Sequence, residues 1–212
     1  MINKIKLSLV LLVIAISQSN ALIEVDITRG NLDPLPIAVS PLSAEKETED
    51  NLAKELKEEN IGQKISEVVE NNLKNSGLFN PLNKDAFLQK PDIAHLKPRF
   101  EDWSLIKAQA LITGKVTIEN AKLKVEFRLW DVLAAREMLA LSFTTVPSNW
   151  RRIGHIITDK VYERLTGEKG YFDTRIIYVA EEGPKNKRIK KLAIMDQDGA
   201  NHKFLTSGKE LV

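Results

Sequence analysis

Residues 110–145 read ALITGKVTIENAKLKVEFRLWDVLAAREMLALSFTT, and this stretch decides the fold. Three of its segments, 110–118, 122–129 and 137–144, alternate apolar and polar side chains with a period of two. Successive side chains of a strand point to opposite faces, so the pattern predicts a three-stranded meander with one buried and one wet face. A parallel sheet buried on both faces would show continuous apolar runs instead. The buried face requires helices to cover it.

Two amphipathic helices are predicted, one before and one after the meander in the sequence. The first begins at Asn60, which has Gln63 three residues later as in a capping box, and ends at Gly77. The second begins at Ser148 and ends at Gly167. Their apolar stripes are Ile61, Ile65, Val68, Val69 and Leu73, and Ile153, Ile156, Ile157, Val161 and Leu165. These segments predict an α+β domain, a mixed or antiparallel sheet with a meander covered by two long helices.

The other segments before the meander are less regular. Residues 36–42 carry three consecutive apolar residues between prolines, which indicates a short strand. Residues 44–59 are dense in charge and have only two leucines at helical spacing, so we expect an exposed, partly helical insertion. Two prolines in residues 86–98 favour a loop.

The pattern changes after the second helix. Residues 175–180, 188–196 and 202–206 read as short strands separated by turn sequences. Short strands at this spacing, without helices, are typical of a propeller blade or a sandwich. We therefore expect a linker at 167–173 and an incomplete first blade of a β-propeller at 174–212, with the rest of that domain missing.

The N-terminus has the pattern of a secretory signal peptide. Residues 1–21 contain two lysines, an apolar run at 7–16 and small residues before the predicted cleavage between Ala21 and Leu22. An N-terminal membrane anchor is the alternative, but the apolar run is short for a span. After cleavage we expect no membrane span. The chain has no cysteine, which excludes disulfides, thiol catalysis and a lipid anchor.

The charge balance gives no reason to expect a nucleic-acid partner. The formal net charge is +2, and the two lysines of the predicted signal peptide account for it. The remaining residues, 22–212, carry as many basic as acidic side chains. The basic residues between 185 and 191 read as the solvated edge of a hairpin.

No motif predicts a metal or cofactor site. The three histidines, His95, His155 and His202, show no pair at ligand spacing. Residues 196–199 read DQDG, but a calcium loop needs glycine at its sixth position and glutamate at its twelfth, where Ser207 stands. We therefore expect a turn here and no bound metal or cofactor.

No catalytic constellation is found either. The nucleophile-elbow, P-loop and Rossmann glycine patterns are all absent. Glu119, Asp131 and Glu137 lie near meander turns, so a secreted hydrolase using loop carboxylates near Asp131 is the rival interpretation. A substrate-binding module of a transport system is a third. We expect no catalytic residues and a protein that is not an enzyme.

Several segments, in collinear order over almost all of the chain after residue 22, resemble the TolB family of the Tol–Pal system. They are IGQKI at 61–65, NSGLFNPL at 75–82, AQALITGKV at 108–116, VEFRLWD at 125–131, NWRRI at 149–153, YERLTGEKG at 162–170, FDTRIIYVA at 172–180 and AIMDQDGAN at 193–201. The resemblance implies an N-terminal α/β domain, residues 22–166 here, followed by a six-bladed propeller.

The resemblance also implies a function. Members of this family are periplasmic, non-enzymatic adaptors that keep the outer membrane intact and follow its invagination at cell division. Their N-terminal segment engages the C-terminal domain of TolA, and their propeller binds the lipoprotein Pal. The matching partner-binding residues here are Leu22, Ile23, Glu24, Val25, Asp26 and Ile27, at the start of a tail that extends to Asp33. Nearly all of the propeller is absent, so no residue here is assigned to Pal.

Overall fold

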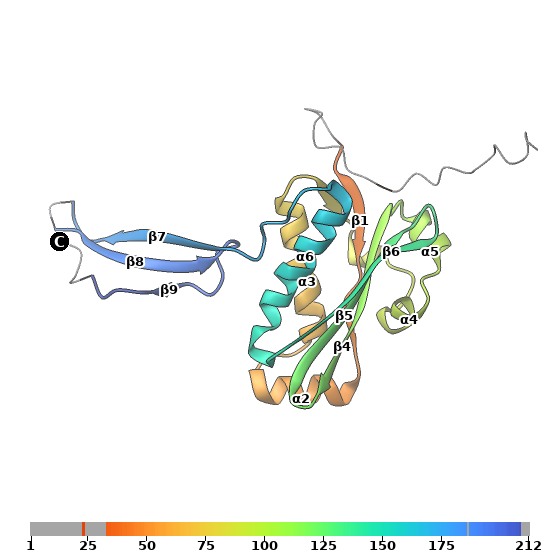
Figure 1. Cartoon of the computed structure of the whole chain (residues 1–212), viewed down its shortest axis with the longest axis horizontal. Coiled ribbons are helices and arrows are strands. Elements are labelled where there is room, and N and C mark those ends of the chain that lie inside the picture. Colours follow the sequence, from red (N-terminus) through yellow and green to blue (C-terminus); the bar gives the residue numbers. More distant parts are fainter. Residues whose placement is uncertain (1–22, 24–32, 186, 209–212) are drawn as a thin grey trace, which may run out of the picture.

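A computed structural model describes residue 23 and residues 33–185 and 187–208. Within these residues the chain forms a mixed sheet covered by helices and a second, smaller sheet beside it (Figure 1). The predicted α+β fold is confirmed. The predicted signal peptide lies outside the described residues, as do the predicted partner-binding residues other than Ile23. None of the described helices is long and apolar enough to cross a membrane.

The predicted meander forms the centre of the main sheet. Its three strands pair antiparallel in sequence order, and the short strand β1 joins it on the other side, parallel to both β3 and β4. The two-residue turn between β4 and β5, Asn120 and Ala121, has positive φ at both positions, as a tight hairpin of this hand requires. The strands are β1 (Leu35–Val39), β2 (Ser43–Ala44), β3 (Phe79–Pro81), β4 (Ala110–Glu119), β5 (Lys122–Asp131) and β6 (Arg136–Thr145).

Two long helices, α3 (Ile61–Asn75) and α6 (Trp150–Thr166), cover one face of this sheet, as predicted (Figure 1). They pack closely at Gly154 of α6, because glycine has no side chain; a Cβ atom there would collide with Val68 of α3. The core between sheet and helices includes the apolar stripes of both helices and the inward residues of the meander, such as Ile112, Val125, Phe127 and Leu129. Each such side chain contributes about 1.5–3 kcal/mol through burial.

The other face of the sheet is not entirely wet, and on this point the prediction is wrong. Two short helices, α4 (Pro91–Leu96) and α5 (Phe100–Leu105), cover one end of it. A second apolar cluster forms there from Ala38, Ala94, Trp103, Ala108, Leu111 and Val132. The segment 86–98, predicted as a loop, therefore contains a helix. Its proline stands at the first helical position, where a missing N–H costs nothing.

The charged segment 44–59 forms the helix α2 (Lys46–Leu56), and it is more than an exposed insertion. Leu52 is fully buried in the core, and Glu49 accepts hydrogen bonds from the backbone N–H groups of Ile61 and Gly62 at the start of α3. The predicted capping box is wrong, because Asn60 makes no side-chain cap. Glu49, from another helix, satisfies these N–H groups instead.

The second long helix also starts differently from the prediction. Ser148 lies in a 3₁₀ turn, η2 (Pro147–Asn149), and the residue that directly precedes α6 is Asn149, which makes no side-chain cap. A second 3₁₀ turn, η1 (Lys84–Ala86), follows β3. The predicted helix ends are confirmed, since Gly77 and Gly167 have a φ of 75° just beyond α3 and α6.

Candidate functional site

A groove runs between the strand β6 and the helix α6, and Ile23 of the N-terminal tail contacts the domain there. Its volume is about 630 Å³. We call it the β6–α6 groove. It is lined by Ile23, Leu139, Leu141, Lys160, Glu163, Arg164 and Gly167.

The alternation of β6 and the helical period of α6 give this groove an apolar floor and a charged rim. Leu139 and Leu141 lie two residues apart on the strand, so they share the face that packs partly against the core. On α6, Lys160 forms an ion pair with Glu163 at 2.9 Å. Arg164 donates from Nε to the backbone carbonyl of Met138 at 3.4 Å, which ties the helix to the strand.

The strand β6 is an edge of the main sheet among the described residues. An edge strand presents unpaired backbone N–H and C=O groups, which an extended segment can join. The β6–α6 groove therefore offers apolar contacts beside a strand edge. Ile23, one of the predicted partner-binding residues, packs partly buried against the core here.

The sequence did not point to the other groove residues. Leu139 and Leu141 lie on the alternating segment 137–144, whose apolar face is predicted to be buried. Nothing in the spacing of Lys160, Glu163 and Arg164 indicates that they line a binding surface. The available signal was the position of β6 as the last strand of the meander, which makes it an edge when no further strand follows.

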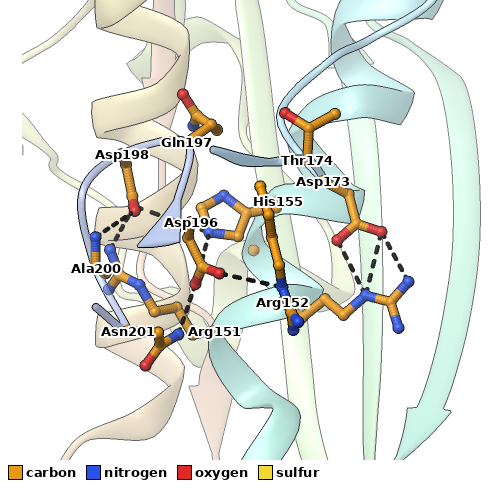
Figure 2. Close-up of polar contacts among 12 residues, drawn as sticks. Arg151, Arg152, His155, Asp173, Thr174, Asp196, Gln197, Asp198, Ala200 and Asn201 are labelled. Carbon is orange, nitrogen blue, oxygen red and sulfur yellow. Dashed lines mark hydrogen bonds and ion pairs between the residues drawn. The ribbon is translucent and has the colours of Figure 1, made fainter. Parts of the chain in front are cut away.

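The linker after α6 is held to that helix by charged groups. Asp159 accepts hydrogen bonds from the backbone N–H groups of Phe172 and Asp173, at 2.7 and 3.1 Å. Asp173 in turn accepts three hydrogen bonds from the guanidinium of Arg152, at 3.0–3.2 Å (Figure 2). Phe172 is 1% exposed and stacks on Tyr171. The direction of the chain as it leaves the domain is thus fixed.

The second sheet consists of β7 (Arg175–Glu182), β8 (Ile189–Asp196) and β9 (Lys203–Phe204), all antiparallel. Its only buried apolar side chain is Ala193, and large apolar residues are exposed on it. These are Ile176, Ile177, Val179, Ile189, Phe204 and Leu205. The three strands were predicted, and the sheet has little core of its own.

The turn between β8 and β9 rests on α3 and α6 through polar contacts, and Figure 2 shows those to α6. Arg151 of α6 forms an ion pair with Asp198, and Gln197 donates to Asn72 of α3 at 2.8 Å. Asn72 also donates to Nδ1 of His155 at 2.9 Å. Burial lowers the pKa of His155, although the carboxylate of Asp198 opposes this effect. His155 thus lies buried at the junction of the two sheets.

The carboxylates of the rival hydrolase hypothesis do not converge. Glu119 and Asp131 lie at opposite ends of the β4–β5 hairpin. Glu119 pairs with Lys124 at 3.0 Å, Glu137 pairs with Arg128 at 2.5 Å, and Asp131 accepts from the backbone N–H of Ala134 at 2.9 Å. Each carboxylate has a structural partner of its own, so nothing in the described residues supports an acid–base pair here.

Comparison with known proteins gives consistent matches. Residues 23–138 match the family described as the TolB amino-terminal domain. The Tol-Pal system protein TolB of Pelagibacter ubique (strain HTCC1062) is 74% identical over 203 residues, which are 96% of this chain and 46% of that protein. The crystal structure of TolB from Acinetobacter baumannii shares the fold, with a TM-score of 0.66 at 22% identity over 87% of this chain and 41% of that one. The chain spans less than half the length of either relative.

Proposed function

Since this chain belongs to the family of the TolB amino-terminal domain, we propose that it acts as a non-enzymatic adaptor of the Tol–Pal system. In this role it binds other proteins of the system and carries out no chemistry. The observation that carries the proposal is the match of more than half of the chain to this family, together with 74% identity to a Tol-Pal system protein. The proposed location is the periplasm, which the predicted signal peptide at 1–21 supports.

The proposed partner-binding element is the tail that begins at Leu22. In an extended conformation Ile23, Val25 and Ile27 share one face, and Glu24 and Asp26 share the other. Such a segment can add a strand to the sheet edge of a partner, where backbone hydrogen bonds give affinity and alternate side chains give specificity. The proposed partner is the C-terminal domain of TolA.

The position of Ile23 supports a role for the tail in controlled binding. Its side chain lies in the β6–α6 groove beside Leu139 and Leu141. The same side chain cannot fill this groove and a pocket on a partner at once. Binding of the tail by a partner therefore has to compete with its contact to its own domain.

The proposed division of the chain follows the same reasoning. A signal peptide at 1–21 precedes the N-terminal domain at 22–166, a linker at 167–173 and part of a first propeller blade at 174–212. The end of α6 at Thr166 and the start of β7 at Arg175 support the last two boundaries. Binding of Pal, and with it outer-membrane integrity and invagination at division, belongs in this proposal to the propeller, so no residue here is assigned to Pal.

The test is a binding assay between the TolA C-terminal domain and the chain that starts at Leu22. Ile23→Asp should weaken binding several-fold, because the apolar anchor on the partner, worth about 1.5–3 kcal/mol, outweighs the partly buried contact that Ile23 gives up in the β6–α6 groove. Glu24→Gln, on the opposite face of the same strand, is the matched control and should change binding less than about threefold. Binding that survives deletion of 22–33 would rule out the tail as the TolA site.

A further inference from the structure

One nitrogen of His155 is enclosed without a partner at the junction of the two sheets. The side chain is 2% exposed, and its Nε2 makes no hydrogen bond within the described part of the chain. Nε2 points toward the carboxylates of Asp198 and Asp196, whose Oδ2 atoms lie 3.8 and 4.0 Å away (Figure 2). These distances are too long for a hydrogen bond.

The three side chains have the arrangement of a metal site. One ligand atom from each of His155, Asp196 and Asp198 lies within 4.8 Å of the others. Around a tetrahedral zinc ion with bonds of about 2.0–2.2 Å, ligand atoms lie roughly 3.4 Å apart. The contacts of Nε2 with the two carboxylates would therefore need to close by only about half an ångström. Three protein ligands leave a fourth position for water.

We propose that His155, Asp196 and Asp198 bind one divalent transition-metal ion, which fastens the β8–β9 turn to α6. The donor set decides the class of ion. An imidazole nitrogen with two carboxylate oxygens suits zinc and similar ions, whereas calcium and magnesium take oxygen ligands. This site adds a metal-dependent joint between the two sheets to the proposed binding function, and it does not depend on that function.

The groups behind the ligands can support metal binding. Nδ1 of His155 lies 2.9 Å from the side-chain amide of Asn72. A ligating histidine carries its proton on the other nitrogen and donates it to a second residue. In the metal-bound state the side-chain amide of Asn72 therefore turns so that its oxygen accepts from Nδ1. Its NH₂ group then faces Gln197. The amide of Gln197 turns as well, so that its oxygen accepts from this NH₂ group. The hydroxyl of Thr158 now accepts from Asn72 at 3.2 Å and donates its only proton to the backbone carbonyl of Gly154 at 2.8 Å, so this rearrangement costs one of these two hydrogen bonds.

Both carboxylates are already oriented by hydrogen bonds. Oδ1 of Asp198 accepts from the backbone N–H of Ala200 at 3.1 Å. Oδ2 of Asp196 accepts from the side chain of Asn201 at 2.5 Å. A carboxylate oxygen has a second lone pair, so neither bond prevents coordination.

Arg151 is the closest cationic competitor of the metal; Arg175 pairs with the other carboxylate, that of Asp196, at a longer distance of 3.7 Å. The guanidinium of Arg151 pairs with Oδ2 of Asp198, which is the same oxygen that faces Nε2 of His155. A metal ion at this oxygen meets the positive charge of Arg151 and has to share or displace its ion pair. Removal of the Arg151 charge should therefore strengthen metal binding, while removal of a ligand should weaken it.

The experiment is calorimetric titration of the chain from Leu22 with zinc chloride near neutral pH. We expect one saturable site per chain, at least about tenfold weaker binding in His155→Gln and Asp198→Asn, and tighter binding in Arg151→Gln. His202→Gln, which removes a histidine outside the cluster, is the matched control and should keep wild-type binding. Calcium chloride, titrated over the concentration range in which zinc saturates the site, should give no saturable binding.

A second measurement keeps the test decisive if a variant is unstable. In the wild-type chain, ¹⁵N NMR should show the His155 proton move to Nδ1 when zinc is added. The proposal is overturned if zinc does not bind, if His155→Gln binds zinc as tightly as the wild type, or if Arg151→Gln binds it more weakly. Because the Arg151 and Asp198 variants are expected to change affinity in opposite directions, general loss of folding cannot imitate the expected result.

Discussion

Gln89 shows how much of the local structure depends on one side chain. It is 4% exposed, donates to the carbonyl of Lys97 at 2.9 Å, and accepts from the backbone N–H of Arg99 and from the indole of Trp103 at 2.9 and 3.1 Å. These bonds hold the turn between α4 and α5 against the sheet. A buried donor left without a partner costs about 1–3 kcal/mol.

We expect Gln89→Leu to reduce the free energy of unfolding by about 1–3 kcal/mol, because the indole N–H of Trp103 would stay buried without an acceptor and the part-buried backbone N–H of Arg99 would lose its acceptor. Urea unfolding followed by tryptophan fluorescence measures this. The matched control is Gln63→Leu, since Gln63 bonds only to Glu67 on the surface of α3. An equal loss in both variants would contradict the assigned role of Gln89.

His95 gives a pH dependence at the same scale. It is 9% exposed on α4, and burial lowers its pKa, with a further contribution from Arg128 and Lys115 that Glu126 opposes. The unfolded chain, with a histidine pKa of about 6.5, therefore binds a proton more readily than the folded chain. The contribution of neutral His95 to the free energy of unfolding is fully present above about pH 6.5. It is lost as the pH falls through the lower pKa that His95 has in the folded state.

We expect His95→Gln to make the free energy of unfolding less dependent on pH between about pH 7 and pH 5. Urea titrations across this range measure the slope. Asn71→Ala, which removes no titratable group, provides the comparison and should keep the wild-type slope. A wild-type slope in His95→Gln would show that His95 does not contribute to the loss of stability in acid.

At the scale of elements, the contact between α3 and α6 sets the shape of the domain. A Cβ atom on Gly154 would lie 2.7 Å from Cγ1 of Val68 and 3.4 Å from the carbonyl oxygen of Ile65. Glycine inside a helix is unfavourable by about 1 kcal/mol relative to alanine. Its presence here therefore reflects the close approach of the two helices.

Gly154→Ala should lower the free energy of unfolding by about 1–3 kcal/mol, because the overlap with Val68 outweighs the gain in helix propensity. Thermal and urea unfolding measure it. Asn71→Ala, at an exposed position of α3, should be neutral or slightly stabilising. A stabilised Gly154→Ala variant would show that the helices can separate without cost.

The whole molecule consists of a well-packed α+β domain and a small sheet held to it by polar contacts. The domain buries a large apolar cluster, whereas the β7–β9 sheet buries only Ala193. Among the described residues, the contacts between them include the Arg152–Asp173 and Arg151–Asp198 ion pairs, the Gln197–Asn72 hydrogen bond and the approach of His155 to Asp196 and Asp198. Such contacts are weakened by salt more than apolar packing is.

We expect backbone amides of β7 to exchange with solvent much faster than those of β4, because opening the second sheet exposes little apolar area. Hydrogen exchange read out by mass spectrometry or NMR compares them. Exchange of β7 should accelerate further with added salt, while β4 provides the internal control. Strong protection of 175–180 in the monomer would contradict this expectation.

The sequence by itself determined the elements whose side-chain pattern is local. The alternation of 110–145 fixed the meander, and the helical stripes fixed α3 and α6, because one face of each had to be buried wherever it packed. The collinear matches to the TolB family were also present in the sequence alone.

Only the tertiary structure decided which distant residues meet. It placed Glu49 of α2 at the start of α3, α4 and α5 over the second face of the sheet, and His155 beside Asp196 and Asp198. Some 40 residues separate His155 from these carboxylates along the chain. Spacing rules detect ligands that lie close together in the chain, and they find only the Asp196 and Asp198 pair. His155 joins this pair through packing of the β8–β9 turn on α6, which no local pattern records.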